Sequence, residues 1–199
     1  MEAASGRANA LSLLGKLVSG LMAETGCAIT SLTGGERDNV IPGQARVCIG
    51  IDPAVVKQVI LFIREEARAC RETYRETDPD LRIRIFPATP PQKDVFTPPE
   101  TAAAAVALLA RLPTGICAMD PVIPGLVATS VNPATVSENE GVLTIGLSAR
   151  SNDDAALAKL GGDTFRKMGP EAGGAAVSIP GGVAPAWHYR EVSPPSVRR

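Results

Sequence analysis

Histidine is almost absent from this sequence: His188 is the only one in 199 residues, and it lies between Trp187 and Tyr189. A histidine pair, a His-Cys pair or an H-E-x-x-H helix therefore cannot be formed by these residues. The four cysteines lie far apart and form no C-x-x-C pair, which excludes a zinc framework of that type and a compact disulfide scaffold. We expect the cysteines to be buried as small apolar residues in a reducing cytosol.

The chain also has few aromatic residues, almost no net charge and no long apolar run. Aromatic residues make up 4% of the chain, and 20 basic residues nearly balance 21 acidic ones. We expect no nucleic-acid partner, because a phosphate backbone requires a basic field and a single strand requires stacking platforms. No stretch approaches the roughly 20 apolar residues of a membrane span, and the first residues lack the pattern of a signal peptide. We therefore expect no membrane partner and a cytoplasmic location.

Motifs that bind phosphate or perform acid-base chemistry are missing as well. The glycine pairs, such as Gly161-Gly162, never match the G-x-G-x-x-G or P-loop pattern. The acidic pair Asp153-Asp154 and the acids Asp78 and Asp80 lie beside predicted helix ends, where capping and the helix dipole account for them. The sequence thus contains no complete active site, and any chemistry needs residues from elsewhere.

Apolar periodicity predicts a succession of helices and short strands. Four segments have helical periodicity: residues 9–24, 53–77, 99–112 and 153–168. Six segments are typical of strands: residues 27–32, 45–51, 81–86, 127–136, 142–149 and 175–179. We predict a cap at Ser151 or Asn152 for the last helix, with Gly161-Gly162 weakening it, and a loop over residues 115–125, which are rich in proline and glycine.

The order of these elements predicts the fold class. Because most strands follow one another directly, we expect an α+β fold: an antiparallel sheet of about six strands with helices packed on one face, of ferredoxin-like type and with an insertion that includes the helix at residues 99–112. Residues 1–186 are predicted to form one domain with a proline-rich connection at residues 87–99. Residues 187–199 are predicted to be a tail that leads to a separate domain.

Two polar residues stand out as candidate ligand contacts. Asn39 precedes Val40 in the long loop between the first two predicted strands, and Arg150 ends a strand just before a helix. The planar guanidinium of an arginine matches a carboxylate, and an asparagine amide can donate beside it. On spacing alone, Asn39 supporting its own turn and Arg150 simply ending a strand remain open alternatives.

Several segments together carry a family resemblance. In chain order they read SGRANALSLLGKL, SLTGGERDNVIPGQARVCI, PTGICAMDPVIPGLVATSVNPATV and GLSARSNDD, followed by APAW. This succession, over about residues 5–194, resembles the lid, or dimerisation, domain of bacterial aminoacyl-histidine dipeptidases, which are carnosinase-like zinc peptidases.

The resemblance implies a division of labour. In the family, a catalytic domain binds two zinc ions, whereas this lid segment holds no metal ligand and no catalytic residue. Asn39, Arg150 and, as a third, Asn132 match positions that hold the substrate's carboxylate or its scissile region. Relatives have an uncharged residue where this chain has Asp38, and Arg37 offsets that charge. The implied partners are the protein's own catalytic domain, a dipeptide substrate and a second copy in a homodimer.

Two other hypotheses stay open at this point. One is a stand-alone ferredoxin-like module that binds a ligand or forms oligomers through a sheet edge. The other keeps the family and replaces the dipeptide by an acylated amino acid. If the dipeptidase hypothesis holds, we expect this sequence to be an inactive piece of a longer protein, with an H-x-D motif upstream and a glutamate pair downstream.

Overall fold

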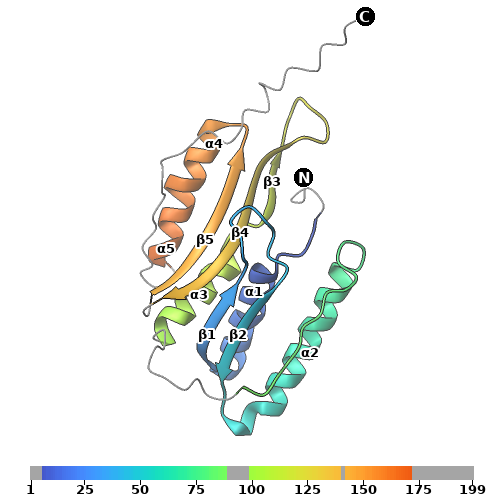
Figure 1. Ribbon diagram of the computed structural model, residues 1–199, viewed down its shortest axis with the longest axis vertical. Helices are drawn as coiled ribbons and strands as arrows, with labels where there is room; N and C mark the ends of the chain where they lie inside the picture. The colour runs from blue at the N-terminus through green and yellow to red at the C-terminus, as the bar shows by residue number, and fades with distance from the viewer. Residues whose placement is uncertain (1–5, 89–98, 140–141, 172–199) are drawn as a thin grey trace, which may run out of the picture.

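A computed structural model describes residues 6–88, 99–139 and 142–171 of the chain (Figure 1). The first half contains α1 (Ala10–Thr25), β1 (Ala28–Gly34), β2 (Ala45–Gly50), the 3-10 turn η2 (Pro53–Val55) and α2 (Val56–Thr73). The second half contains α3 (Pro99–Arg111), β3 (Gly115–Met119), β4 (Val127–Asn139), β5 (Val142–Ser151), α4 (Asp154–Lys159), the π-helical turn η3 (Leu160–Phe165) and α5 (Arg166–Glu171).

The five strands form one antiparallel sheet around β4. One edge of β4 pairs with β5 along most of its length, from Thr129↔Ser151 to Asn139↔Val142. Its other edge pairs with β3 at one end and with β1 at Gly34↔Val136, and β1 pairs in turn with β2. The two hairpins, β1–β2 and β4–β5, therefore meet through their inner strands.

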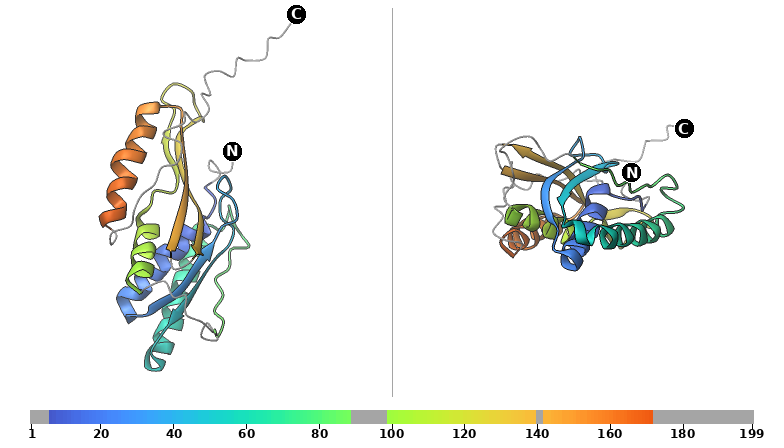
Figure 2. Two further views of the ribbon diagram at one scale, coloured as in Figure 1. Left: turned by 60° about the vertical axis from the view of Figure 1, so that its left-hand side comes forward. Right: turned by 90° about the horizontal axis from the view of Figure 1, so that it is seen from below.

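The helices cover one face of this sheet (Figure 2). Each half of the chain runs from a helix through a hairpin to a helix, and the second half has the additional strand β3 before its hairpin. The first helices of the two halves, α1 and α3, pack directly on each other. Gly15 makes this close approach possible, since a Cβ atom added there would lie 2.7 Å from Leu109 Cβ and 2.9 Å from the backbone nitrogen of Ala110.

The hydrophobic core lies between the helices and the sheet. Apolar side chains of α1 and α3 recur every three or four residues, which is the spacing that places them on one helix face. The fully buried residues of the core include Leu11, Val18, Leu21, Leu32, Val106, Leu109 and Val131. The predicted α+β class, the helix-covered sheet face and the first three helices are confirmed.

The predicted strand at residues 81–86 is wrong. Residues 81–88 are extended but pair with no strand, and in Figure 1 they run back along α2. Ile83 packs against the core, whereas Ile85 and Phe86 are 50% and 71% exposed. The alternation of apolar and charged residues in this segment indicates an extended chain with one residue facing the core. It does not indicate whether a neighbouring strand is available for pairing.

Three other predictions need correction. Residues 115–125 contain strand β3, since its backbone pairs with β4 although four of its five side chains are exposed. The cap of α4 is Asp153, whose side chain accepts a hydrogen bond from the Ala155 N–H at 2.9 Å; Ser151 Oγ accepts the N–H of Asp153 instead. Cys27 is buried as expected, but Cys117 is exposed.

Other predictions fall partly or wholly outside the described residues. These are the strand at residues 175–179, the tail at residues 187–199, His188 and most of the connection at residues 87–99. Five strands lie within the described part of the chain, against about six predicted.

Replacement of Gly15 by alanine should destabilise the fold. The added methyl group meets the backbone of α3, so overpacking should outweigh the roughly 1 kcal/mol gain in helix propensity and lower the free energy of unfolding by about 1–2 kcal/mol. Urea unfolding measures the change. Gly50→Ala is the control, because nothing lies within 4 Å of the added atom there. Equal stability of Gly15→Ala and the unmodified chain would contradict the close packing of α1 on α3.

The start of α1 is tied to the segment after α2 by Asp78. Its carboxylate accepts hydrogen bonds from the backbone N–H of Ala8 at 2.8 Å and from the guanidinium of Arg7 at 3.3 Å. Partial burial raises the pKa of Asp78, but the hydrogen bonds from Ala8, Thr77 and Arg7 outweigh burial, so its pKa lies below the ordinary value of 3.8. This carboxylate therefore stabilises the folded chain in its ionised form.

Acid should remove this contribution. Because the pKa is lower in the folded chain, the stabilisation is complete above pH 3.8 and is lost as the pH falls through the folded-state pKa. Asp78→Asn should cost about 1–2 kcal/mol in unfolding free energy at pH 7 and progressively less below pH 4, measured by urea unfolding at each pH. A difference between the two proteins that does not change with pH would disprove the role of the ionised carboxylate.

Candidate functional site

The buried side chain of Asn9 joins α1 to the sheet. Asn9 is 3% exposed and caps α1, its Oδ1 accepting the N–H of Ser12 at 3.0 Å. Its Nδ2 donates to the carbonyl of Pro133 and to Oδ1 of Asn132, both at 2.9 Å. On this edge β4 pairs with β3 up to Val131 and with β1 at residue 136, and Asn9 binds β4 between those two pairings.

The loop at residues 35–44, which connects β1 to β2, is anchored at several points. Gly35 opens it with a φ of +69°, and a Cβ atom there would collide with the carbonyl oxygen of Ala134 in β4, so only glycine fits. The carbonyl of Pro42 accepts the N–H of Ala10 at 3.0 Å. The carbonyl of Val40 accepts a hydrogen bond from Asn132 Nδ2 at 2.9 Å. The loop is thereby held against α1 and β4.

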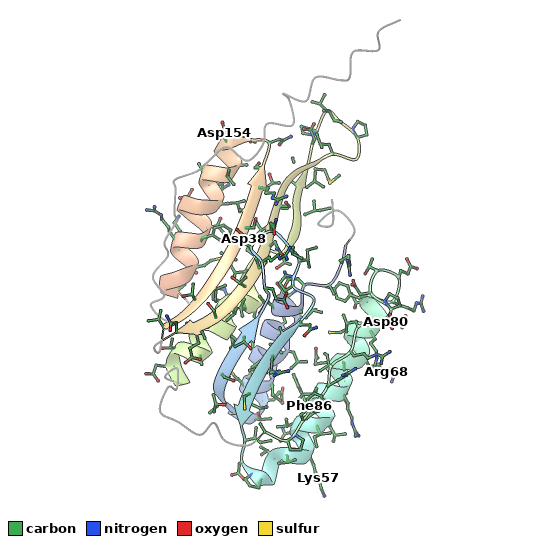
Figure 3. The ribbon with its side chains drawn as sticks, viewed as in Figure 1. Asp38, Lys57, Arg68, Asp80, Phe86 and Asp154 are labelled. Carbon is green, nitrogen blue, oxygen red and sulfur yellow. The ribbon has the colours of Figure 1, made fainter. Side chains whose placement is uncertain are left out.

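Asn39 lies in this loop, next to Val40, and is exposed. Its side-chain amide makes no hydrogen bond with any described residue, so it does not support its own turn. The neighbouring Arg37 and Asp38 are also exposed, and neither forms an ion pair within the described residues. Figure 3 shows Asp38 in front of β4, where the loop crosses the sheet. The amide of Asn39 is therefore available to a ligand.

Arg150 lies on the face of the sheet that the helices leave open. It pairs with Ser130 across the β4–β5 ladder, whereas its neighbour Ala149 and the facing Val131 pack in the core. Because alternate residues point to opposite faces, Arg150 and Asn132 share the open face. They are diagonal neighbours in the ladder, roughly 7–8 Å apart. Arg150 is exposed and forms no ion pair or hydrogen bond with the residues that the structure describes.

Hydrogen bonds of the next two residues fix the end of β5 that carries Arg150, whereas the Arg150 side chain itself forms no such bond with the described residues. Ser151 Oγ and Thr129 Oγ1 share a buried hydrogen bond of 2.8 Å. Asn152 Nδ2 donates to Asp120 Oδ2 at 2.6 Å, and the other oxygen of Asp120 accepts two backbone N–H groups of the loop after β3. An anchored backbone thus presents a guanidinium that has no partner among the described residues, and such a group matches a carboxylate in geometry and charge.

A cavity of about 300 Å³ opens beside Asn132, between the start of α1, the end of α2 and the strands β3 and β4. Arg7, Lys16, Tyr74 and Thr114 contribute polar groups to its lining. None of these four was predicted as a site residue. The only sequence signal was the GRANA segment at the start of α1, which carries the family resemblance but has no spacing typical of a binding site.

The structure thus brings Asn132 and Arg150 onto one face and ties the loop of Asn39 to Asn132. The binding roles of all three remain predictions.

The part of the chain that the structure describes contains no group of three His, Cys, Asp or Glu residues able to hold a metal ion. Among these same residues, no helix is both long enough and apolar enough to span a bilayer.

Comparison with known proteins agrees with the resemblance predicted from sequence. Residues 3–78 match the family model of a peptidase dimerisation domain. The crystal structure of aminoacylhistidine dipeptidase from Vibrio alginolyticus has a similar fold, with a TM-score of 0.75 and 22% sequence identity over 84% of this chain and 34% of that one. No curated protein matches the chain.

These matches confirm the resemblance to the dimerisation domain of such a dipeptidase. The family match covers the first half of the fold, and the structural likeness shows that the architecture is shared. The chain spans about a third of the length of the solved dipeptidase.

Proposed function

We propose that this chain is the substrate-clamping lid of a zinc-dependent dipeptidase that hydrolyses dipeptides of the Xaa-His type. The observation that carries the proposal is the state of Asn39 and Arg150: both side chains are exposed and without partners among the described residues, yet both stand on anchored backbone. The fold shared with an aminoacylhistidine dipeptidase supports this substrate class.

In this proposal the lid recognises the carboxylate end of the dipeptide. The guanidinium of Arg150 forms two parallel hydrogen bonds to the carboxylate, and the amide of Asn39 donates to the carboxylate or to the scissile carbonyl. Both groups lose water when the lid closes on a substrate, which strengthens their hydrogen bonds and orients the dipeptide for attack.

Zinc chemistry belongs to a separate catalytic domain in this proposal. Two zinc ions would supply the activated water, with ligands outside the described residues, which offer no set of three. The contribution of this chain is binding and orientation, so the isolated chain is inactive. The family description of a dimerisation domain also supports pairing with a second copy, in addition to contact with the catalytic domain.

Removal of the Arg150 guanidinium should weaken hydrolysis in the full-length product of the gene. We expect Arg150→Ala to lower kcat/KM for an Xaa-His dipeptide by roughly 10- to 100-fold, mainly through KM, because one charged contact is lost. Arg68→Ala is the matched control. Arg68 is likewise exposed, but it lies on α2, away from β4 and β5 (Figure 3), so its removal should leave kcat/KM unchanged.

A substrate whose C-terminal carboxylate is replaced by an amide identifies the group that Arg150 binds. The unmodified enzyme should lose a similar factor on this substrate, and Arg150→Ala should lose little more, because both changes remove the same contact. Multiplied losses would show that Arg150 does not bind the carboxylate. An unchanged kcat/KM for Arg150→Ala would remove this residue from the site, and turnover by the isolated chain would contradict its role as a lid.

A further inference from the structure

Both polar atoms of the Asn132 side chain are occupied in the described structure. Oδ1 accepts a hydrogen bond from Asn9, and Nδ2 donates to the carbonyl of Val40, each at 2.9 Å. The two partners come from opposite ends of the same region, one from the buried cap of α1 and the other from the exposed loop at residues 35–44. Asn132 therefore links a rigid element to a loop.

The bond to Val40 acts on the residue next to Asn39. Residues 36–40 are all exposed, so this part of the loop has little buried apolar contact to hold it in place. The end of the loop is anchored separately, through the bond from Ala10 to Pro42. The hydrogen bond from Asn132 is thus the described side-chain contact closest in sequence to Asn39.

We infer that Asn132 is a positioning residue for Asn39, acting through the loop rather than on the substrate. This inference rests on the proposed function, and it changes the role predicted for Asn132 from sequence. Asn9 orients the amide of Asn132 from the buried side, and Asn132 in turn fixes the peptide that follows Asn39. The amide of Asn39 is then ordered before the substrate binds, so binding does not have to supply the conformational entropy cost of ordering the loop.

A double-mutant cycle in the full-length enzyme tests this inference. We expect Asn39→Ala and Asn132→Ala each to lower kcat/KM, with Asn132→Ala losing no more than Asn39→Ala. The double variant should be as active as Asn39→Ala alone, because Asn132 has nothing left to position. Losses that multiply in the double variant would overturn the inference and assign Asn132 its own contact with substrate.

A second measurement, on the 199-residue chain, does not depend on activity. Asn132→Asp keeps the acceptor for Asn9 and removes only the donor to Val40, so the fold should survive while the backbone NMR order parameters of residues 38–40 fall. Asn139→Asp is the matched control, with the same change of charge at an exposed residue at the far end of β4. Order parameters that are as high in Asn132→Asp as in the control would overturn the inference.

The two measurements separate this inference from the proposed function. Lower order parameters in the loop of Asn132→Asp, together with full activity of Asn39→Ala, would support the hydrogen bond between Asn132 and the loop and refute the part of the proposed function that involves Asn39. Loss of activity in Asn39→Ala, together with unchanged order parameters in Asn132→Asp, would overturn this inference and leave the proposed role of Asn39 in place.

Discussion

The buried amide of Asn9 is the interaction on which the site depends. One side chain satisfies a free N–H at the start of α1, a carbonyl of β4 and the acceptor of Asn132. The hydrogen bonds to Ser12 and Pro133 are buried, so these two backbone groups would lack a partner in the protein interior if the amide were absent. The same hydrogen-bonded group therefore connects α1 to the sheet and, through Asn132, to the loop at residues 35–44.

The remainder of the fold holds this arrangement in place and leaves both candidate ligand contacts, Asn39 and Arg150, exposed. Gly15 allows α1 to pack on α3, and Gly35 allows the loop to start against β4. The end of β5 is fixed through Ser151 and Asn152. Asn39 and Arg150 project from these anchored segments without partners of their own in the described structure. The proposed substrate clamp needs such a combination of anchored backbone and polar groups that are free to bind.

The sequence predicted those features that depend on local pattern. The first three helices and the strands predicted at residues 127–136 and 142–149 follow from the spacing of apolar residues, and the structure contains them. Strand β3 was missed because an exposed edge strand has no alternating pattern. The link from Asn9 to Asn132 joins residues 123 apart, which no local pattern reports. For Asn39 and Arg150, spacing alone left structural roles open, and only the family resemblance selected them as site residues.

Amide hydrogen exchange in Asn9→Ser tests most directly whether Asn9 holds the loop and β4 together. Serine still caps α1, but its side chain is too short to reach Pro133 and Asn132. We expect exchange at least about tenfold faster for the N–H groups of Ala10 and Gly35, which donate to the carbonyls of Pro42 and Gln44 at the end of the loop, with unchanged protection at Val18 inside α1. Unchanged exchange at Ala10 and Gly35 would contradict it.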